Sequence, residues 1–189
     1  MSELRFVFVT SRPEKVTEAQ RLGFRLERLD LDLSEPQALD PEDVAREKVR
    51  MAWEHLRRPV LVEDSGLEIL AWGGFPGALV KWLERSAGLE AIVRMLEPFP
   101  DRRARAVCVI ACFDGEQILT ARGVTEGAIA PAPRGAGGFG WDPIFVPRGS
   151  DRTFAELPPS EKDAVSHRAL AWAAMAEKLG SLRRRGSDP

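Results

Sequence analysis

The polar stretch TSRPEK, residues 10–15, follows the apolar run RFVFV and carries residue types that could bind an anion. Pro13 favours the first position of a helix, and the free backbone N–H groups of a first helical turn suit an anion. Arg12 and Lys15 add positive charge, although Glu14 opposes them. The same pattern also fits an ordinary N-terminal cap made by a hydroxyl group. The stretch alone therefore predicts either an anion site or a simple strand-to-helix turn.

Two acidic residues follow a second apolar run, in VEDSGLE at residues 62–68. Successive side chains of a strand face opposite sides, so Glu63 and Asp64 cannot both reach one site. A carboxylate at a strand end, followed by Ser65 and a turn at Gly66, suits a Mg²⁺ ligand or a base that activates water. A capping or salt-bridging acid fits the same residues. A second metal ligand would come from another loop, where the candidates are Asp30, Asp32 and Glu35.

The glycine-rich stretch GAGGFGWDPIF, residues 135–145, has the composition of a site for a flat ligand. Its glycines let the backbone approach a planar ring closely, and Phe139 or Trp141 could stack on that ring. Asp142 could accept hydrogen bonds from the edge of a base. A glycine-rich turn that places aromatic side chains in the core is the competing interpretation.

The stretch SEKDAVSHRAL, residues 160–170, offers three more polar side chains that could contact a ligand, Lys162, His167 and Arg168. Offsets of five and six residues do not place them on one face of a single helix. Ser166 could instead cap a new helix and place His167 and Arg168 in its first turn, beside free N–H groups. Such a helix start would form a second site for an anion or a base edge.

The four stretches lie where predicted strands and helices meet. Hydrophobic periodicity predicts helices at residues 13–22, 41–56, 88–97 and 166–179. It predicts strands at residues 5–9, 25–31, 59–66 and 143–147, and a long antiparallel hairpin from residues 105–113 and 116–130. This order indicates an α/β, or mixed α+β, domain with a mixed, twisted β-sheet flanked by helices. Residues 1–182 form the single predicted domain, and residues 183–189 a frayed tail.

The composition of the 189-residue chain excludes several classes of protein. Its formal net charge of −2 argues against a protein that coats nucleic acid, because such proteins carry a strong basic excess. No apolar stretch approaches the length of a membrane span, and the N-terminus lacks a signal-peptide pattern, so we expect a cytoplasmic protein without a membrane partner. Cys108 and Cys112 share one face of a predicted strand but lie too far apart to pair, and are expected to be buried thiols.

Five motifs occur in a specific order along nearly the whole chain: FVFVTSRPEK, LVEDSGLE, GGFPGALVKWL, GGFGWDPIFVP and TFAELPPSEKDAVSHRAL. In these motifs the chain resembles the inosine triphosphate pyrophosphatases, which hydrolyse deaminated purine nucleoside triphosphates such as ITP, dITP and XTP to the monophosphate and pyrophosphate. The resemblance implies an elongated, two-lobed fold with its active site in a central cleft, Mg²⁺ as cofactor, and a homodimer. Trp72, Phe75 and Trp82 are candidate dimer contacts, or else core residues.

The resemblance also implies roles for individual residues. Asp64 would be the proton acceptor and, together with Glu35, a metal ligand. Phe139 would stack on the base, while Arg168 or backbone N–H groups would donate to a 6-oxo group, which adenine lacks. The implied substrate-binding residues are Thr10, Ser11, Arg12, Pro13, Glu14, Lys15, Lys48, Ser65, Phe139, Gly140, Trp141, Asp142, Lys162, His167 and Arg168.

In the implied mechanism, Mg²⁺ bridges phosphate oxygens while Lys15, Lys48 and backbone N–H groups neutralise developing charge. Water activated by Asp64 or by the metal attacks the α-phosphorus, and pyrophosphate leaves. Arg12 departs from the family pattern, which has asparagine there, and Pro13 stands where a small residue is usual. Arg12 could contact phosphate or point to solvent. Two rival functions stay open: hydrolysis of modified pyrimidine triphosphates, and nucleotide sensing without hydrolysis.

Overall fold

A seven-stranded mixed sheet forms the centre of the molecule, in the order β2-β1-β3-β5-β6-β7, with β4 paired to β3. The computed structural model describes residues 6–185, with side chains described up to residue 180. The strands are β1 (Val7–Val9), β2 (Glu27–Leu29), β3 (Val60–Ile69), β4 (Pro76–Gly77), β5 (Arg103–Phe113), β6 (Ile118–Ile129) and β7 (Phe145–Pro147). The helices are α1 (Pro13–Arg21), α2 (Pro41–Leu56), α3 (Val80–Ala87), α4 (Leu89–Met95), α5 (Pro159–Val165) and α6 (His167–Arg185), with short 3-10 turns η1 (Leu70–Trp72) and η2 (Asp142–Ile144). The predicted fold class is confirmed.

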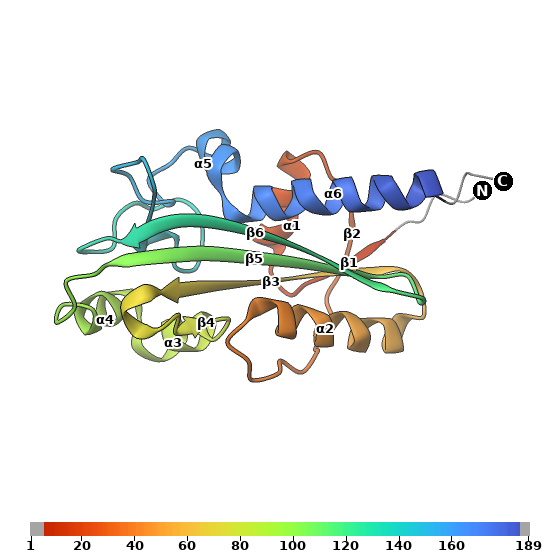
Figure 1. Ribbon diagram of the computed structural model, residues 1–189, viewed down its shortest axis with the longest axis horizontal. Coiled ribbons are helices and arrows are strands. Elements are labelled where there is room, and N and C mark those ends of the chain that lie inside the picture. Colours follow the sequence, from red (N-terminus) through yellow and green to blue (C-terminus); the bar gives the residue numbers. More distant parts are fainter. Residues whose placement is uncertain (1–5, 186–189) are drawn as a thin grey trace.

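The strands combine parallel and antiparallel pairing. β1 pairs in parallel with both neighbours, so that Val9 lies opposite Leu29 of β2 and Val62 of β3. The longer strands β3, β5 and β6 are antiparallel and extend along the length of the molecule (Figure 1). β5 and β6 pair along their whole length, which confirms the predicted hairpin.

Helices cover both faces of the sheet, with α6 along one face and α2 along the other (Figure 1). Because successive side chains of a strand face opposite sides of the sheet, the buried residues form a separate cluster on each face. The α6 face buries Phe8, Leu61, Cys108, Ile110, Cys112 and Trp172. The α2 face buries Val7, Val9, Ala45, Val49, Ala52, Val60, Val62, Val107 and Val109. Both cysteines are therefore buried, and they are unpaired as predicted.

A third apolar cluster joins α3 and α4 to the segment around η2 and β7. Its buried members include Val80, Ile92, Trp141, Ile144, Phe145 and Phe154. Leu67 and Ile69 of β3 also belong to it, so this cluster extends the core beyond the part of the sheet that α2 and α6 cover. The stretch around Trp141 thus contributes to the core.

The structure corrects several predicted element boundaries. β3 does not end in a turn at Gly66 but continues to Ile69. Gly66 instead allows close packing, because a Cβ there would lie 2.7 Å from the backbone carbonyl carbon of Gly77. The predicted strand at 25–31 shortens to β2, and the helix α3 was not predicted. α6 continues to Arg185, while residues 186–189 of the predicted tail lie outside the described residues. Within the described part of the chain, no helix is long and apolar enough to cross a membrane.

Candidate active site

A pocket of about 470 Å³ opens where β1 ends and β3 continues past it. The carboxyl ends of parallel strands are common ligand positions in α/β sheets. Pro13 and Glu14 lie outside the pocket on the exposed first turn of α1, and Lys162 is buried and does not line the pocket. The other predicted site residues line it: Thr10, Ser11, Arg12, Lys15, Glu35, Lys48, Asp64, Ser65, Phe139, Gly140, Trp141, Asp142, His167 and Arg168.

The loop between β1 and α1 leaves the start of α1 without a side-chain cap. Arg12 is the N-cap residue, and its side chain makes no capping hydrogen bond. The backbone N–H of Arg12 donates to Thr10 Oγ1 at 3.1 Å. Arg28 of β2 donates to the carbonyl oxygens of Thr10 and Ser11 at 3.1 and 3.3 Å, which holds the loop against the sheet. The interpretation as an ordinary side-chain cap is therefore wrong, and the helix start remains suited to an anion.

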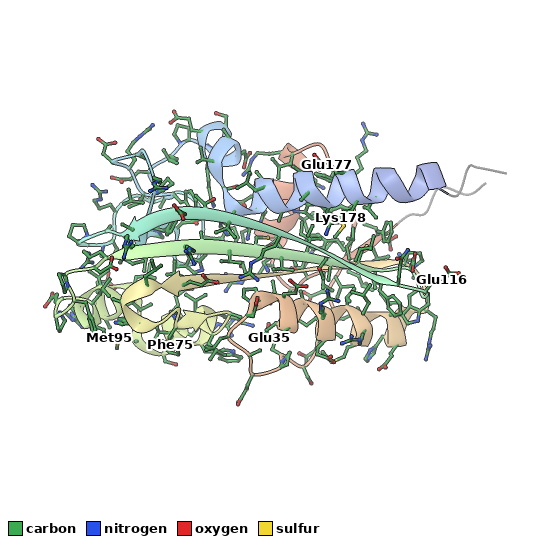
Figure 2. All side chains as sticks on the ribbon, viewed as in Figure 1. Glu35, Phe75, Met95, Glu116, Glu177 and Lys178 are labelled. Atoms are coloured by element: carbon green, nitrogen blue, oxygen red, sulfur yellow. The ribbon has the colours of Figure 1, made fainter. Side chains whose placement is uncertain are left out.

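Asp64 and Glu35 lie on either side of one ammonium group. Lys48 of α2 places Nζ 3.4 Å from Asp64 Oδ2 and 3.3 Å from Glu35 Oε1. Lys81 of α3 donates to both carboxylate oxygens of Glu35 at 2.9 Å. Glu35 lies in the segment that leads into α2, near the start of that helix (Figure 2). The acid at the centre of the sheet and the acid from this loop thus occupy one site.

The two carboxyl groups titrate differently. Burial raises the pKa of Asp64 above its ordinary value, although Lys48 and Lys15 favour its charged form. Burial also acts to raise the pKa of Glu35, but Lys81 and Lys48 outweigh it and lower that pKa overall. Glu35 is therefore held as a carboxylate, whereas Asp64 has the properties of a proton acceptor.

The donor set fits a magnesium ion that arrives with a phosphorylated ligand. Mg²⁺ typically takes one or two carboxylates and completes its shell with phosphate oxygens and water. Asp64 and Glu35 provide such a pair, because both approach the position of one positive charge. Among the residues whose side chains are described, no group of three or more His, Cys, Asp or Glu could hold a metal ion by itself.

Glu63 faces the opposite side of β3 from Asp64 and begins a buried ionic network. Arg168 Nε donates to both carboxylate oxygens of Glu63 at 3.0 and 3.1 Å, and its Nη1 donates to Glu18 of α1. Lys162 Nζ donates to Glu18 at 2.8 Å and to Asp142 at 2.6 Å. Each buried charge thus has an opposite partner, as burial requires. The network connects α1, α5 and α6 to the glycine-rich stretch.

Within the glycine-rich stretch, Phe139 is the aromatic residue that remains partly exposed in the pocket. Trp141 is 7% exposed and packs edge-on against Phe145. Asp142 Oδ2 accepts a hydrogen bond from the Phe139 backbone N–H at 2.8 Å in addition to that from Lys162. This oxygen therefore fixes the turn around Phe139, which is a structural role that the sequence did not predict.

The structure confirms that Ser166 begins a new helix. Its Oγ accepts a hydrogen bond from the Ala169 N–H at 3.1 Å, which places His167 and Arg168 in the first turn of α6. His167 is 1% exposed and lies between the rings of Trp141 and Phe154. Burial lowers its pKa well below the ordinary value, so the imidazole is neutral. Among the described residues, neither ring nitrogen has a hydrogen-bond partner.

A sequence model of the Ham1 family matches residues 6–178, which include all of the elements above up to α6. The chain belongs to the Ham1 family. It is 40% identical over 181 residues to a dITP/XTP pyrophosphatase of Thermococcus kodakarensis, covering 93% of this chain and 97% of that protein. An inosine triphosphate pyrophosphatase of Puccinia graminis is 38% identical over 183 residues, covering 90% and 94%. The solved structure of a HAM1 protein from Coxiella burnetii matches with a TM-score of 0.82 at 32% identity, covering 95% of this chain and 100% of that one.

In this Ham1 chain, α3 supplies pocket residues that were not predicted from the sequence to line the site. They are Lys81, Trp82, Glu84 and Arg85. The GALVKWLERS segment carries apolar residues at helical spacing, and this periodicity indicates the helix. Glu18 was missed as well, because an acid on an amphipathic helix gives no sign that it will be buried. Only the packing of α1 against α5 and α6 makes it a partner of Lys162.

Proposed function

We propose that this Ham1 protein hydrolyses deaminated purine nucleoside triphosphates, namely ITP, dITP and XTP, to the monophosphate and pyrophosphate. The observation that carries the proposal is one pocket lined by two chemically different groups of residues. Asp64 and Glu35 around Lys48 form what we call its charged end, and the partly exposed Phe139 ring forms what we call its base end. A nucleoside triphosphate has matching parts, a charged polyphosphate and a flat base.

The proton transfer at the charged end takes place between a water molecule and a base. Asp64, whose pKa is raised by burial, accepts a proton from the water. The water oxygen forms a bond to the α-phosphorus while the bond from that phosphorus to the bridging oxygen breaks. Pyrophosphate leaves with the electron pair of the broken bond. Lys15, Lys48 and Lys81 provide positive charge along the polyphosphate, together with the uncapped start of α1.

Asp64 and Glu35 are the residues that would hold Mg²⁺. When bound, the ion would neutralise phosphate oxygens and polarise the phosphorus for attack. Lys48 contacts both carboxylates and Lys81 contacts Glu35, so these lysines keep the acids close together in the protein alone. The ion is thus proposed as a cofactor that substrate brings to a prepared pair of carboxylates.

We further propose a cytoplasmic homodimer that acts on free nucleotides and binds neither nucleic acid nor membrane. The net charge of −2 supports the absence of a polyanionic partner. Phe75 and Met95 are 40% and 47% exposed and lie at the same end of the molecule (Figure 2). Trp72 instead packs against the core cluster of α3 and α4, and Trp82 is 50% exposed at the pocket. A monomeric mass in light scattering would contradict the dimer.

A substrate panel tests the main proposal. The pure protein is incubated with Mg²⁺ and ITP, dITP, XTP, GTP, ATP or a modified pyrimidine triphosphate, and released pyrophosphate is measured. The expected result is turnover of the first three and at least 100-fold lower kcat/KM for ATP, since sites built on hydrogen bonds discriminate by about 10⁴-fold. Turnover of the pyrimidine nucleotide alone, or binding of ITP without turnover, would replace the proposal with one of its rivals.

A further inference from the structure

The guanidinium of Arg12 is a free set of hydrogen-bond donors at the base end of the pocket. Its Cζ lies 5.8 Å from the centroid of the Phe139 ring. Among the described residues, no acceptor takes a hydrogen bond from this guanidinium and no carboxylate pairs with it within 4.0 Å. The hydrogen bonds of Arg12 are made by its backbone, whose N–H donates to Thr10 Oγ1 and whose carbonyl oxygen accepts from the Lys15 N–H. An arginine presents five N–H donors in a planar fork, and these remain available to a ligand.

The two other cations near Phe139 are already committed to carboxylates. Arg168 Cζ and Lys162 Nζ lie 5.1 and 5.2 Å from the ring centroid. Arg168 uses Nε and Nη1 on Glu63 and Glu18, and Lys162 is bonded to Glu18 and Asp142. Arg168, which we expected to supply the main donors to a base, is 2% exposed and directs two of its nitrogens at buried carboxylates.

Gly140 and Glu84 are close neighbours of the Arg12 guanidinium, and neither takes a hydrogen bond from it. A Cβ at Gly140 would lie 3.8 Å from Arg12 Nη1 and 3.5 Å from Glu84 Oε2, so the two charged groups flank Gly140. Burial raises the pKa of Glu84, and the charge of Arg12 acts against that rise. Arg12 thus interacts electrostatically with Glu84 of α3, although the two groups form no close ion pair.

We propose that Arg12 is a specificity-determining residue of the purine subsite, donating two hydrogen bonds to the O6 and N7 atoms of a 6-oxopurine. This inference rests on the proposed function. Bidentate donation from arginine to these two acceptors is the commonest specific contact to guanine in nucleic-acid recognition, and hypoxanthine and xanthine present the same edge. Adenine carries an amino donor in place of O6, and would oppose the guanidinium.

The Arg12 guanidinium lies over the Phe139 ring, with Cζ 5.8 Å from the ring centroid. Atoms in face-to-face contact lie about 3.5 to 4.0 Å apart, so the guanidinium is not packed directly against the ring. Its donors are therefore close to any base that stacks on Phe139. The side chain belongs to the residue that begins α1, so a single segment carries both a base contact and the anion-binding helix start.

A ligand that lacks N7 provides the direct test. The kcat/KM of ITP is compared with that of 7-deaza-ITP for the wild type, Arg12→Asn and Arg12→Lys. We expect the wild type to favour ITP by about 10- to 100-fold, the value of one good bidentate contact. Arg12→Asn should reduce this ratio nearly to one, and Arg12→Lys, which keeps the charge but loses the planar fork, should fall between. Inhibition by inorganic tripolyphosphate should be nearly equal in the wild type and Arg12→Asn.

Arg85→Asn is the matched control, because Arg85 also lines the pocket but its guanidinium lies over Trp82. This variant should change kcat/KM for ITP and for 7-deaza-ITP to the same extent. The opposite outcome is that Arg12→Asn weakens inhibition by tripolyphosphate as much as it lowers kcat/KM for ITP, and leaves the ratio of kcat/KM between ITP and 7-deaza-ITP unchanged. That result would mean that Arg12 contacts phosphate, and it would overturn the inference. If the wild type does not hydrolyse ITP at all, the proposed function fails, and calorimetric binding of IMP and 7-deaza-IMP to the same variants still decides the role of Arg12.

Discussion

Lys48 and Asp64 meet inside the pocket, with Lys48 Nζ 3.4 Å from Asp64 Oδ2. The lysine comes from a helix on one face of the sheet, and the acid comes from the central strand. Asp64 is nevertheless a carboxyl group with a raised pKa, because the effect of burial exceeds that of the neighbouring ammonium groups. The pair therefore holds a strong proton acceptor next to a positive charge that stabilises its ionised form.

Replacing Asp64 by asparagine should remove most activity while the protein stays folded. The amide keeps the shape of the side chain but accepts no proton, and positioned general bases contribute roughly 10²- to 10⁴-fold. We expect kcat with ITP to fall at least about 100-fold and the melting temperature to change by a few degrees at most. Retention of wild-type kcat would mean that Asp64 has a purely structural role.

The pH profile of kcat/KM should reveal the same acid. Only ionised Asp64 accepts a proton, so activity falls as the pH drops through its raised pKa, at a higher pH than for an ordinary aspartate. Lys48 lowers that pKa, so Lys48→Met should move the acidic limb to still higher pH, besides reducing overall activity. A limb that stays in place, or moves to lower pH, would assign the titration to another group.

Removal of divalent cations should abolish turnover, and added Mg²⁺ should restore it. Glu35→Gln should raise the Mg²⁺ concentration needed for half-maximal activity, because one of two carboxylates is lost. Glu14→Gln, an exposed residue outside the pocket, tests whether any loss of acidic charge has this effect, and its Mg²⁺ requirement should match the wild type. Full activity in EDTA would exclude the metal role.

The buried network around Glu18 should contribute to stability in a pH-dependent way. Arg168 and Lys162 outweigh burial and lower the pKa of Glu18, so its contribution is present above the ordinary glutamate pKa and is lost as the pH falls through the lowered value. Glu18→Gln should therefore reduce the free energy of unfolding at pH 7 by about 3 kcal/mol. Urea titrations should show the difference from wild type shrinking at low pH, and Glu177→Gln on the surface of α6 should show neither effect.

Gly123 sets the distance between β6 and α6. A Cβ at this position would lie 2.1 Å from the carbonyl oxygen of His167 and 2.4 Å from the Ala171 nitrogen, both backbone atoms. Gly123→Ala should therefore displace the first turn of α6, lowering the melting temperature and raising KM for ITP through Arg168. A variant with unchanged stability and KM would show that the helix start adjusts freely.

Much of this arrangement could be predicted from the sequence because local patterns determined it. The 3.6-residue period of α2 and the Asp-Gly turn between β5 and β6 gave boundaries close to those observed. Ser166 could be recognised as a helix start because serine is a common N-cap residue. In addition, the spacing of Lys162, His167 and Arg168 does not fit one face of a single helix. The order of the five motifs was specific enough to indicate the family that the comparison confirms.

The missed features depend on packing between distant segments. Gly66 indicated a turn by its type, but its role is to let β4 and the start of α2 approach β3. Asp142 was predicted to face a ligand, whereas Lys162 and a backbone N–H occupy one of its oxygens. The position of Arg12 near Phe139 joins residues 127 positions apart, and no local pattern predicts such a contact.

The burial of both cysteines has a practical consequence for labelling the protein. Burial raises the pKa of Cys112 to about 11 and that of Cys108 well above the ordinary thiol value, so neither forms a thiolate readily near neutral pH. Alkylating reagents and maleimide dyes should leave both untouched in the folded protein. A cysteine introduced at an exposed position of α3 would then be the sole reactive thiol, so a single fluorophore could be attached beside the pocket without first deleting the native cysteines.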